Sequence, residues 1–300
     1  MQICPKKQSI AFLLHAAWRA VLSAAALTMI FSCFACHLEK APKTIDPETE
    51  PGWSLWMDES FDGQQVDETR WDTGFPWGRC WPPLYYTKTG NIEINEGILQ
   101  LIARSEVVTG FCFDWDEAGN FTPYYADFPY TSGMFYSRQA FRYGYFECRF
   151  KVPRGKSFNA AFWLYGEEDS EIDVFEILGS NPADAQMTLH WKNRDPLVGT
   201  RQWPKHIVCN TPSFAEGWHT FGLLWEPNRL EWYLDGKRVE QSLWTRFIRG
   251  RHIPTVDMHL ILTLAIGVMD GYPDETTPFP SAFEVDRVRV FHTPESILPS

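Results

Sequence analysis

The sequence predicts an all-β protein, namely a two-sheet antiparallel β-jelly-roll sandwich with a substrate cleft. Three observations support this fold class. From Trp53 onward the 300-residue chain consists of short β-like runs separated by turn signals. No long segment shows helical periodicity. Strand-like runs also occur near both ends of this region, as they do in sandwiches where both termini supply strands.

The first 36 residues are predicted to be a signal peptide. Lys6 and Lys7 precede an apolar run at 20–31, which is shorter than the roughly 20 residues of a membrane span. Cys33 and Cys36 follow small residues directly behind this run. This arrangement resembles a bacterial lipoprotein signal, in which the cysteine becomes lipidated. Simple secretion and a lone anchor helix are the alternatives.

Residues 37–52 are polar, contain proline and have almost no aliphatic side chains, so they predict a flexible tether. The folded domain is then expected over 53–300. An exported chain with this layout would reside in the bacterial cell envelope through a lipid anchor, or outside the cell. The anchor would be its only contact with a membrane, and we expect a monomer.

Composition narrows the classes of partner. The formal net charge of -11 and the lack of a basic stripe disfavour nucleic acid. Aromatic residues make up 16% of the chain, with 14 Trp and 22 Phe, which suits stacking against the apolar faces of sugar rings. For any single Trp, burial in a β core is the simpler explanation.

The cysteines leave the disulfide pattern open. Four of the 7 lie beyond the predicted leader: Cys80, Cys112, Cys148 and Cys209. Four cysteines allow three pairings, and the sequence does not choose among them. Cys148 shares the apolar face of the alternating run 143–152, which predicts a buried core thiol.

The strands follow in order along the chain. Residues 91–103 predict a hairpin with its turn at 95–97. Residues 219–239 predict three strands separated by turns at Pro227 and Asp235. The run 259–267 is apolar on both faces, as in a central strand, and 283–292 forms a final strand. Two other segments, 74–86 and 110–130, are too polar or too rich in proline for core strands and predict the rims of a cleft.

The run SEIDVFEILG, 170–179, carries Glu171, Asp173 and Glu176. Side chains alternate along a strand, so Glu171 and Asp173 share a face while Glu176 has the opposite parity. If Phe175 is the extra residue of a β-bulge, the phase resets and Glu176 joins the other two acids. Without a bulge, Glu176 would enter the core unpaired, which is costly. The pattern therefore predicts three acids on one face.

Such a cluster suits glycoside hydrolysis with retention. Two leaning carboxylates would lie about 5 to 6 Å apart, leaving no room between them for the water of an inverting enzyme. Glu171 and Glu176 would need separated pKa values, because one must attack as an anion and the other must deliver a proton. Asp173, between them, can orient the nucleophile and keep the other acid protonated. A solvated acidic face or a calcium cluster is the alternative.

At this point the sequence resembles glycoside hydrolase family 16 in its form with a bulged catalytic strand. The resemblance covers nearly the whole chain after the tether. The matching motifs occur in the family's order: DESFDG at 58–63, GNIEINEGILQL at 90–101, YTSGMFYSRQAFRYGYFECRFKVPRGKSFNAAFWL at 130–164, EIDVFE at 171–176, LHW at 189–191, WHTFGLLWEPNRLEWYLDGK at 218–237 and EVDRVRVF at 284–291.

The resemblance implies a retaining endo-β-glycanase that cleaves a β-linked polysaccharide and needs no cofactor for catalysis. It implies Glu171 as nucleophile, Glu176 as general acid/base and Asp173 as supporting acid. Trp163 would form the floor of the cleft, and His190 resembles the family's cleft histidine.

Further implied contacts are less direct. Parity places Asn159 and Tyr165 on the face of the Trp163 side chain, where they would bind substrate. Asp286 matches a side chain that in the family often binds a structural calcium, with a salt bridge to an arginine as the alternative.

The substrate branch is less defined. Laminarinases of the family usually have Trp and Pro just before AFWL, whereas this chain has Phe158, Asn159 and Ala160. That segment is closer to the branches acting on algal galactans such as agar, porphyran or carrageenan, where Arg79 and Arg142 would face a sulfate or be surface charges. A β-1,3-glucan remains a candidate substrate. A non-catalytic sugar-binding sandwich and a transglycosylase using the same intermediate are the alternative functions.

Overall fold

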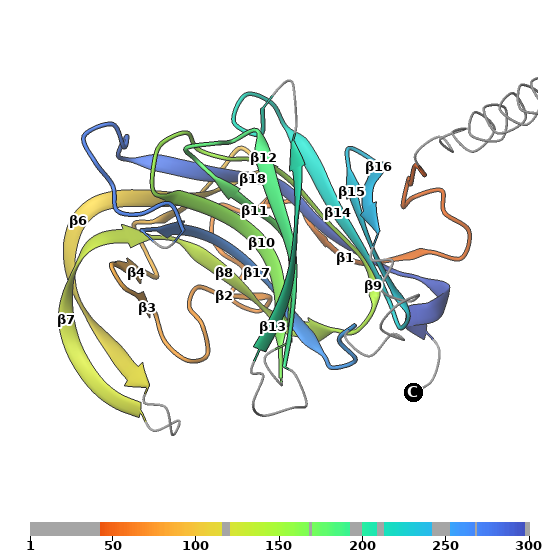
Figure 1. Ribbon diagram of the computed structural model, residues 1–300, viewed down its shortest axis with the longest axis horizontal. Coiled ribbons are helices and arrows are strands. Elements are labelled where there is room, and N and C mark those ends of the chain that lie inside the picture. Colours follow the sequence, from red (N-terminus) through yellow and green to blue (C-terminus); the bar gives the residue numbers. More distant parts are fainter. Residues whose placement is uncertain are drawn as a thin grey trace, which may run out of the picture. The chain divides into compact units, whose positions relative to one another are not determined.

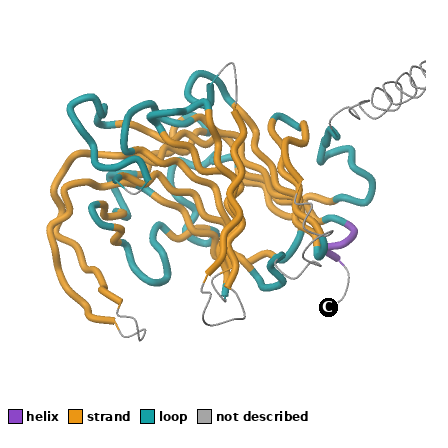
Figure 2. Tube along the Cα trace, in the orientation of Figure 1, coloured by secondary structure: helices purple, strands orange, loops and turns teal. Residues whose placement is uncertain are grey.

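The computed structural model describes residues 43–115, 121–167, 170–192, 200–208, 213–241, 253–267 and 269–297. Strands make up most of these residues, and their one helix is a four-residue 3₁₀ turn at Pro294–Ile297 (Figure 2). None of their helices is long and apolar enough to cross a membrane. The predicted signal peptide lies outside the described residues.

Two sheets form the fold (Figure 1). The larger has the strand order β16 (Lys237–Gln241), β15 (Arg229–Leu234), β14 (His219–Glu226), β9 (Gly144–Lys151), β18 (Ser281–His292), β6 (Ile98–Trp115), β7 (Phe121–Ser132), β4 (Leu84–Tyr86) and β3 (Cys80–Trp81). Two further strands attach to it: β1 (Ser54–Glu59) pairs with β18 and β5 (Ile92–Asn95) pairs with β6. The smaller has the order β13 (Thr200–Val208), β12 (Asp184–Lys192), β11 (Ser170–Leu178), β10 (Phe158–Gly166), β17 (Met258–Ile266), β8 (Met134–Phe141) and β2 (Trp71–Asp72). The strand pairs are antiparallel, apart from β4 with β7. The predicted all-β sandwich is confirmed.

The core lies between the two sheets. On β9 the alternation predicted from the sequence is confirmed, since Phe146, Cys148 and Phe150 belong to the main core whereas Tyr145 belongs to a separate cluster. On β17 nearly every residue is buried, as expected of a strand that lies between β10 and β8 and is covered on both faces. This rigid central part of the smaller sheet carries the candidate site on its neighbours β10 and β11.

Two predicted turns have the expected backbone. Ile94 and Asn95 of β5 pair with β6 through a two-residue turn, in which Glu96 and Gly97 have φ of 50° and 78°. Both values lie in the left-handed region required by the turn type that matches the twist of a hairpin. The turn between β15 and β16 repeats this geometry at Asp235 and Gly236.

The predicted tether is too long at its C-terminal end. Thr44 forms a β-bridge with Lys237, and the amide of Ile45 donates to the carbonyl of Gly236 over 2.8 Å. The Ile45 side chain is buried in a small cluster with Tyr145 and other residues on the outer face of the larger sheet. Burial of the isoleucine contributes about 1.5–3 kcal/mol, and backbone hydrogen bonds such as that from the amide of Thr49 to the carbonyl of Asp46 also hold the segment. The compact unit therefore begins at Thr44 instead of residue 53.

The segment 110–130, predicted as the rim of a cleft and not as core strand, belongs mostly to the strands β6 and β7. β6 and β7 form a long hairpin that curves away from the rest of the sheet, with β3 and β4 inside the curve (Figure 1). Period-2 alternation was hidden there because aromatic and polar residues occur on both faces. A disulfide joins Cys80 of β3 to Cys112 of β6, with 5.5 Å between the Cα atoms. Cys148 is a buried free thiol as predicted, and Cys209 lies outside the described residues.

Candidate active site

The predicted β-bulge is present on β11. Against β10 the pairing passes from Asp173 with Trp163 to Phe175 with Phe162. Against β12 it passes from Asp173 with Thr188 to Glu176 with Gln186, so Val174 and Phe175 together oppose one residue of that strand. Both Val174 and Phe175 are fully buried in the core. Two consecutive core residues shift the alternation by one, as the sequence required. Glu176 thereby returns to the face of the other two acids.

The three acids line one pocket of about 110 Å³ on the smaller sheet. Glu171 and Glu176 are accessible in part, whereas Asp173 between them is 3% exposed. Trp163 and Asn159, predicted to bind substrate, border the same pocket. The Trp163 indole N–H donates to Thr263 Oγ1 over 3.3 Å, which fixes the ring on the adjoining strand.

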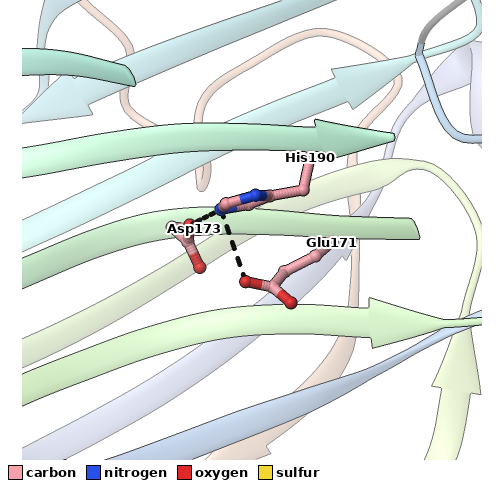
Figure 3. A group of neighbouring side chains, drawn as sticks. All are labelled: Glu171, Asp173 and His190. Carbon is pink, nitrogen blue, oxygen red and sulfur yellow. Dashed lines mark hydrogen bonds and ion pairs between the residues drawn. The ribbon is translucent and has the colours of Figure 1, made fainter. Parts of the chain in front are cut away.

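His190 joins two of the acids from the neighbouring strand (Figure 3). It pairs directly with Glu171 across β11 and β12. Its Nε2 lies 3.1 Å from Asp173 Oδ2 and 3.5 Å from Glu171 Oε1. The predicted cleft histidine is therefore in place, and it contacts the acids from within the site.

Glu176 is held by two amide groups. Asn159 Nδ2 donates to Glu176 Oε1, and Gln186 Nε2 donates to Glu176 Oε2, each over 3.2 Å. Gln186 was not singled out from the sequence, although it has the parity of His190 on β12 and pairs with Glu176 in register. That spacing is the sequence signal that would have identified it.

Burial raises the pKa of each acid in the pocket. For Glu171, burial and the neighbouring Asp173 raise the pKa to about 8. Burial also holds the pKa of Asp173 well above its usual range. The pKa of Glu176 is raised by burial, against the opposing effect of the N–H donors of Asn159 and Gln186. Like charges at this spacing cannot all ionise at neutral pH, so the cluster retains a proton that can be delivered to a substrate.

Tyr165 lies next to the acids but lines a separate hollow. This residue pairs with Glu171 on one side and with His259 of β17 on the other. Tyr165 and His259 line a second hollow of about 560 Å³, together with Trp77 and Arg142. Tyr165 therefore lies on the expected face but at the boundary of this second hollow, next to the acids.

The segment 74–86, predicted from its composition to be the rim of a cleft, contributes to the wall of the acid pocket. Phe75, Trp81 and Tyr86 face the pocket of the acids. The Arg79 guanidinium fixes the loop by donating to the carbonyl oxygens of Thr73, over 2.5 Å, and Tyr86, over 3.3 Å.

The surroundings of Asp286 match the alternative to calcium. Its carboxylate forms an ion pair with Arg149, whose guanidinium lies 5.0 Å from the centre of the Trp218 ring. A guanidinium in contact opposes a second cation at this carboxylate. The carboxylate thus forms the salt bridge named as the alternative, and calcium binding at Asp286 stays a prediction.

Among the described residues, only one group brings together three side chains that could ligate a metal: Glu171, Asp173 and His190, whose ligand atoms lie within 4.8 Å of one another. Two carboxylates and one imidazole supply fewer oxygens than the six to eight that calcium takes. The calcium cluster considered as an alternative for the acids is therefore not supported by this set.

Comparison with known proteins agrees with the geometry. The family model for glycosyl hydrolases family 16 matches residues 85–282. A β-glucanase of Rhodothermus marinus is 27% identical over 295 residues, which cover 88% of this chain and 92% of the relative.

Solved structures share the fold. The laminarinase catalytic domain of Thermotoga maritima aligns with a TM-score of 0.66 at 27% identity, covering 80% of this chain and 98% of that domain. Porphyranase B of Zobellia galactanivorans aligns with a TM-score of 0.64 at 18% identity, covering 84% and 99%, a likeness of fold alone. With the family model matching most of the chain and the acids on a bulged strand, this protein belongs to the glycosyl hydrolases of family 16.

Proposed function

We propose that the protein is a retaining endo-glycanase that hydrolyses a β-linked glucan inside its chain. The observation that carries the proposal is the bulge on β11, which places Glu171 and Glu176 in one pocket with Asp173 between them. Two carboxyl groups around one pocket are what a glycosidic bond requires, since one attacks the anomeric carbon while the other protonates the leaving oxygen.

The reaction proceeds in two displacements. In the first, Glu171 forms a covalent bond to the anomeric carbon as the glycosidic C–O bond breaks, and Glu176 gives its proton to the departing oxygen. In the second, Glu176 takes a proton from water, which attacks the anomeric carbon and releases Glu171. A transglycosylase would use a sugar hydroxyl in place of that water.

The charge state of Glu171 depends on two opposing effects, burial and the neighbouring His190. With a pKa raised to about 8 by burial, the carboxyl is mostly protonated at neutral pH in the ligand-free protein, whereas a nucleophile must be ionised. An imidazolium at His190, 3.5 Å away, lowers the pKa of Glu171. His190 is thus proposed to oppose the effect of burial and so to increase the fraction of Glu171 that is ionised. The same Nε2 lies 3.1 Å from Asp173 Oδ2.

Two observations support an uncharged glucan over a sulfated galactan. The relatives with at least 25% identity include a β-glucanase and a laminarinase. Both arginines considered for a sulfate are already engaged: Arg79 with backbone carbonyls of its own loop, and Arg142 in an ion pair with Asp257 over 2.8 Å. Removing an arginine from such partners to bind an anion costs the existing hydrogen bonds. A galactan remains the alternative.

The predicted signal peptide supports a location outside the cytoplasm for the proposed activity. A polysaccharide is too large to enter a cell, so the proposed enzyme requires export, and the residues before 37 have the pattern of a lipoprotein-type signal. We propose a monomer in the cell envelope or outside the cell.

The test is product analysis by mass spectrometry after incubating the full chain with laminarin, lichenan, agarose, porphyran and carrageenan. Oligosaccharides of several lengths from laminarin or lichenan are expected, and release from porphyran or carrageenan alone would refute the glucan assignment. Proton NMR of the first product tests retention, because the β-anomer must appear before mutarotation. Binding to one polysaccharide with no cleavage of any would favour a sugar-binding module.

A further inference from the structure

A third hollow, which is largely aromatic, lies outside the catalytic pocket, between the segment 74–86 and the curved β6–β7 hairpin. Its volume is about 440 Å³. The hairpin contributes Phe111 and Phe113, while the loop contributes Phe75, Trp77 and Tyr85. None of these side chains is required for the chemistry of the three acids.

Alternation along β6 presents the two phenylalanines on one face, with their ring centres 4.8 Å apart. The Phe111 side chain is 37% exposed, which leaves an apolar ring accessible to solvent. On the loop side, the Tyr85 ring lies so close to Gly110 that a Cβ there would be 2.3 Å from a ring carbon. The glycine at this position therefore permits the close approach of loop and hairpin.

The hollow is held in place by covalent and backbone bonds. The disulfide between Cys80 and Cys112 joins the loop to the hairpin between the two phenylalanines. β4 also pairs in parallel with β7, with Tyr85 opposite Thr131. A surface fixed in this way binds a ligand with little loss of conformational entropy.

The hollow adjoins the catalytic pocket at one residue. Phe75 borders both, and its ring is stacked on Trp77 with 4.8 Å between the centres. The centre of the Phe75 ring is also 6.0 Å from that of Trp163, the tryptophan beside the acids. A polysaccharide that leaves the catalytic pocket past Phe75 therefore meets the aromatic hollow next.

The charge of the hollow selects its ligand. Of the described residues that line it, Arg79 carries the charge, and its guanidinium donates to the carbonyl oxygens of Thr73 and Tyr86. What remains is a neutral aromatic surface, which favours the apolar face of an uncharged pyranose. We propose that the hollow is a further sugar-binding subsite that takes a neutral pyranose unit of the same polysaccharide beyond the catalytic pocket. This inference rests on the proposed function.

The test compares Phe111→Ala with the unchanged full chain on laminarin and on laminari-oligosaccharides of decreasing length. Loss of one stacked ring is expected to raise KM for laminarin about 2- to 10-fold. The ratio of the KM of Phe111→Ala to the KM of the unchanged protein should fall towards 1 as the oligosaccharide becomes too short to reach the hollow. Val107→Ala is the matched control, because Val107 is on the same strand, 72% exposed and outside the hollow.

Two further measurements keep the outcome unambiguous. Phe111→Tyr retains the ring and should keep the KM of the unchanged protein, which a folding defect at this position would not predict. Equal KM values for Phe111→Ala and Val107→Ala at every length would overturn the subsite.

If the unchanged protein cleaves no glucan, the proposed function fails, and electrophoresis in gels containing laminarin still tests the hollow. Retardation that is weakened by Phe111→Ala supports it, and retardation that is unchanged or absent refutes it.

Discussion

Glu171 and His190 face each other directly across β11 and β12, with His190 Nε2 3.5 Å from Glu171 Oε1. The same nitrogen is 3.1 Å from Asp173 Oδ2, so one imidazole contacts two acids of the pocket. A positive charge there favours the ionised form of both carboxyl groups. The electrostatics of the pocket therefore depend on a residue outside the strand that carries the acids.

Glu171→Gln should abolish turnover while polysaccharide binding stays close to that of the unchanged protein. The amide has the shape of the carboxyl group but cannot attack the anomeric carbon, so kcat should fall at least about 1000-fold. Reducing-sugar release and gel retardation measure the two properties. Glu93→Gln, at a carboxyl with 53% side-chain exposure on β5, is the control and should retain full activity. Residual turnover above 10% would rule out the nucleophile assignment.

His190→Phe should move the acidic limb of the kcat/KM profile to higher pH. Loss of the imidazolium removes an effect that lowers the pKa of Glu171, which is already raised to about 8. A higher pKa means that less Glu171 is ionised at neutral pH, so activity there falls and recovers partly as pH rises. Profiles between about pH 5 and 10 provide the measurement. A uniform loss at all pH values would argue against an electrostatic role.

Asp173→Asn should shift the same limb in the opposite direction. The negative charge of Asp173 raises the pKa of Glu171, and its removal lowers that pKa, so Glu171 becomes ionised at lower pH. The loss of the interaction with His190 should also reduce kcat about 10- to 100-fold through misorientation, less than Glu171→Gln does. An unchanged limb in this variant would remove the supporting role of Asp173.

Gln186→Leu tests which acid carries the proton. Gln186 donates to Glu176 Oε2, and this hydrogen bond lowers the pKa of Glu176, so its loss should raise that pKa. If Glu176 is the general acid, the alkaline limb of the profile moves to higher pH. Movement of the acidic limb instead would show that Glu176 is the nucleophile and would exchange the roles of the two glutamates.

The double variant Cys80→Ser/Cys112→Ser should lose about 2–4 kcal/mol of unfolding free energy, because the cross-link restricts the unfolded chain. Guanidinium denaturation with and without a reducing agent provides the measurement. The reductant should lower the midpoint of the unchanged protein and have no effect on the variant. Equal midpoints for both proteins without reductant would show that the disulfide contributes nothing to stability.

Several features followed from local sequence pattern alone. The alternation on β9, the turns at Glu96 and Asp235 and the apolar β17 all reflect the period-2 geometry of strands and the backbone preferences of turn residues. The parity of the three acids likewise demanded a bulge, because a buried unpaired Glu176 would be unfavourable.

Other features needed the third dimension. The strand partners on either side of the bulge, the start of the compact unit at Thr44 and the pairing of Cys80 with Cys112 depend on which segments lie side by side. Register between strands is set by packing across the sheet, and a single sequence does not encode it locally.

The sequence by itself determined the fold class, the three acids and their shared face, because alternation and burial act along one strand. Only the tertiary structure decided what surrounds them: Gln186 on Glu176, His190 between two acids and the aromatic hollow at Phe111. These contacts join residues far apart in the chain, and they are fixed by the packing of neighbouring strands and by the disulfide that holds the loop to the hairpin.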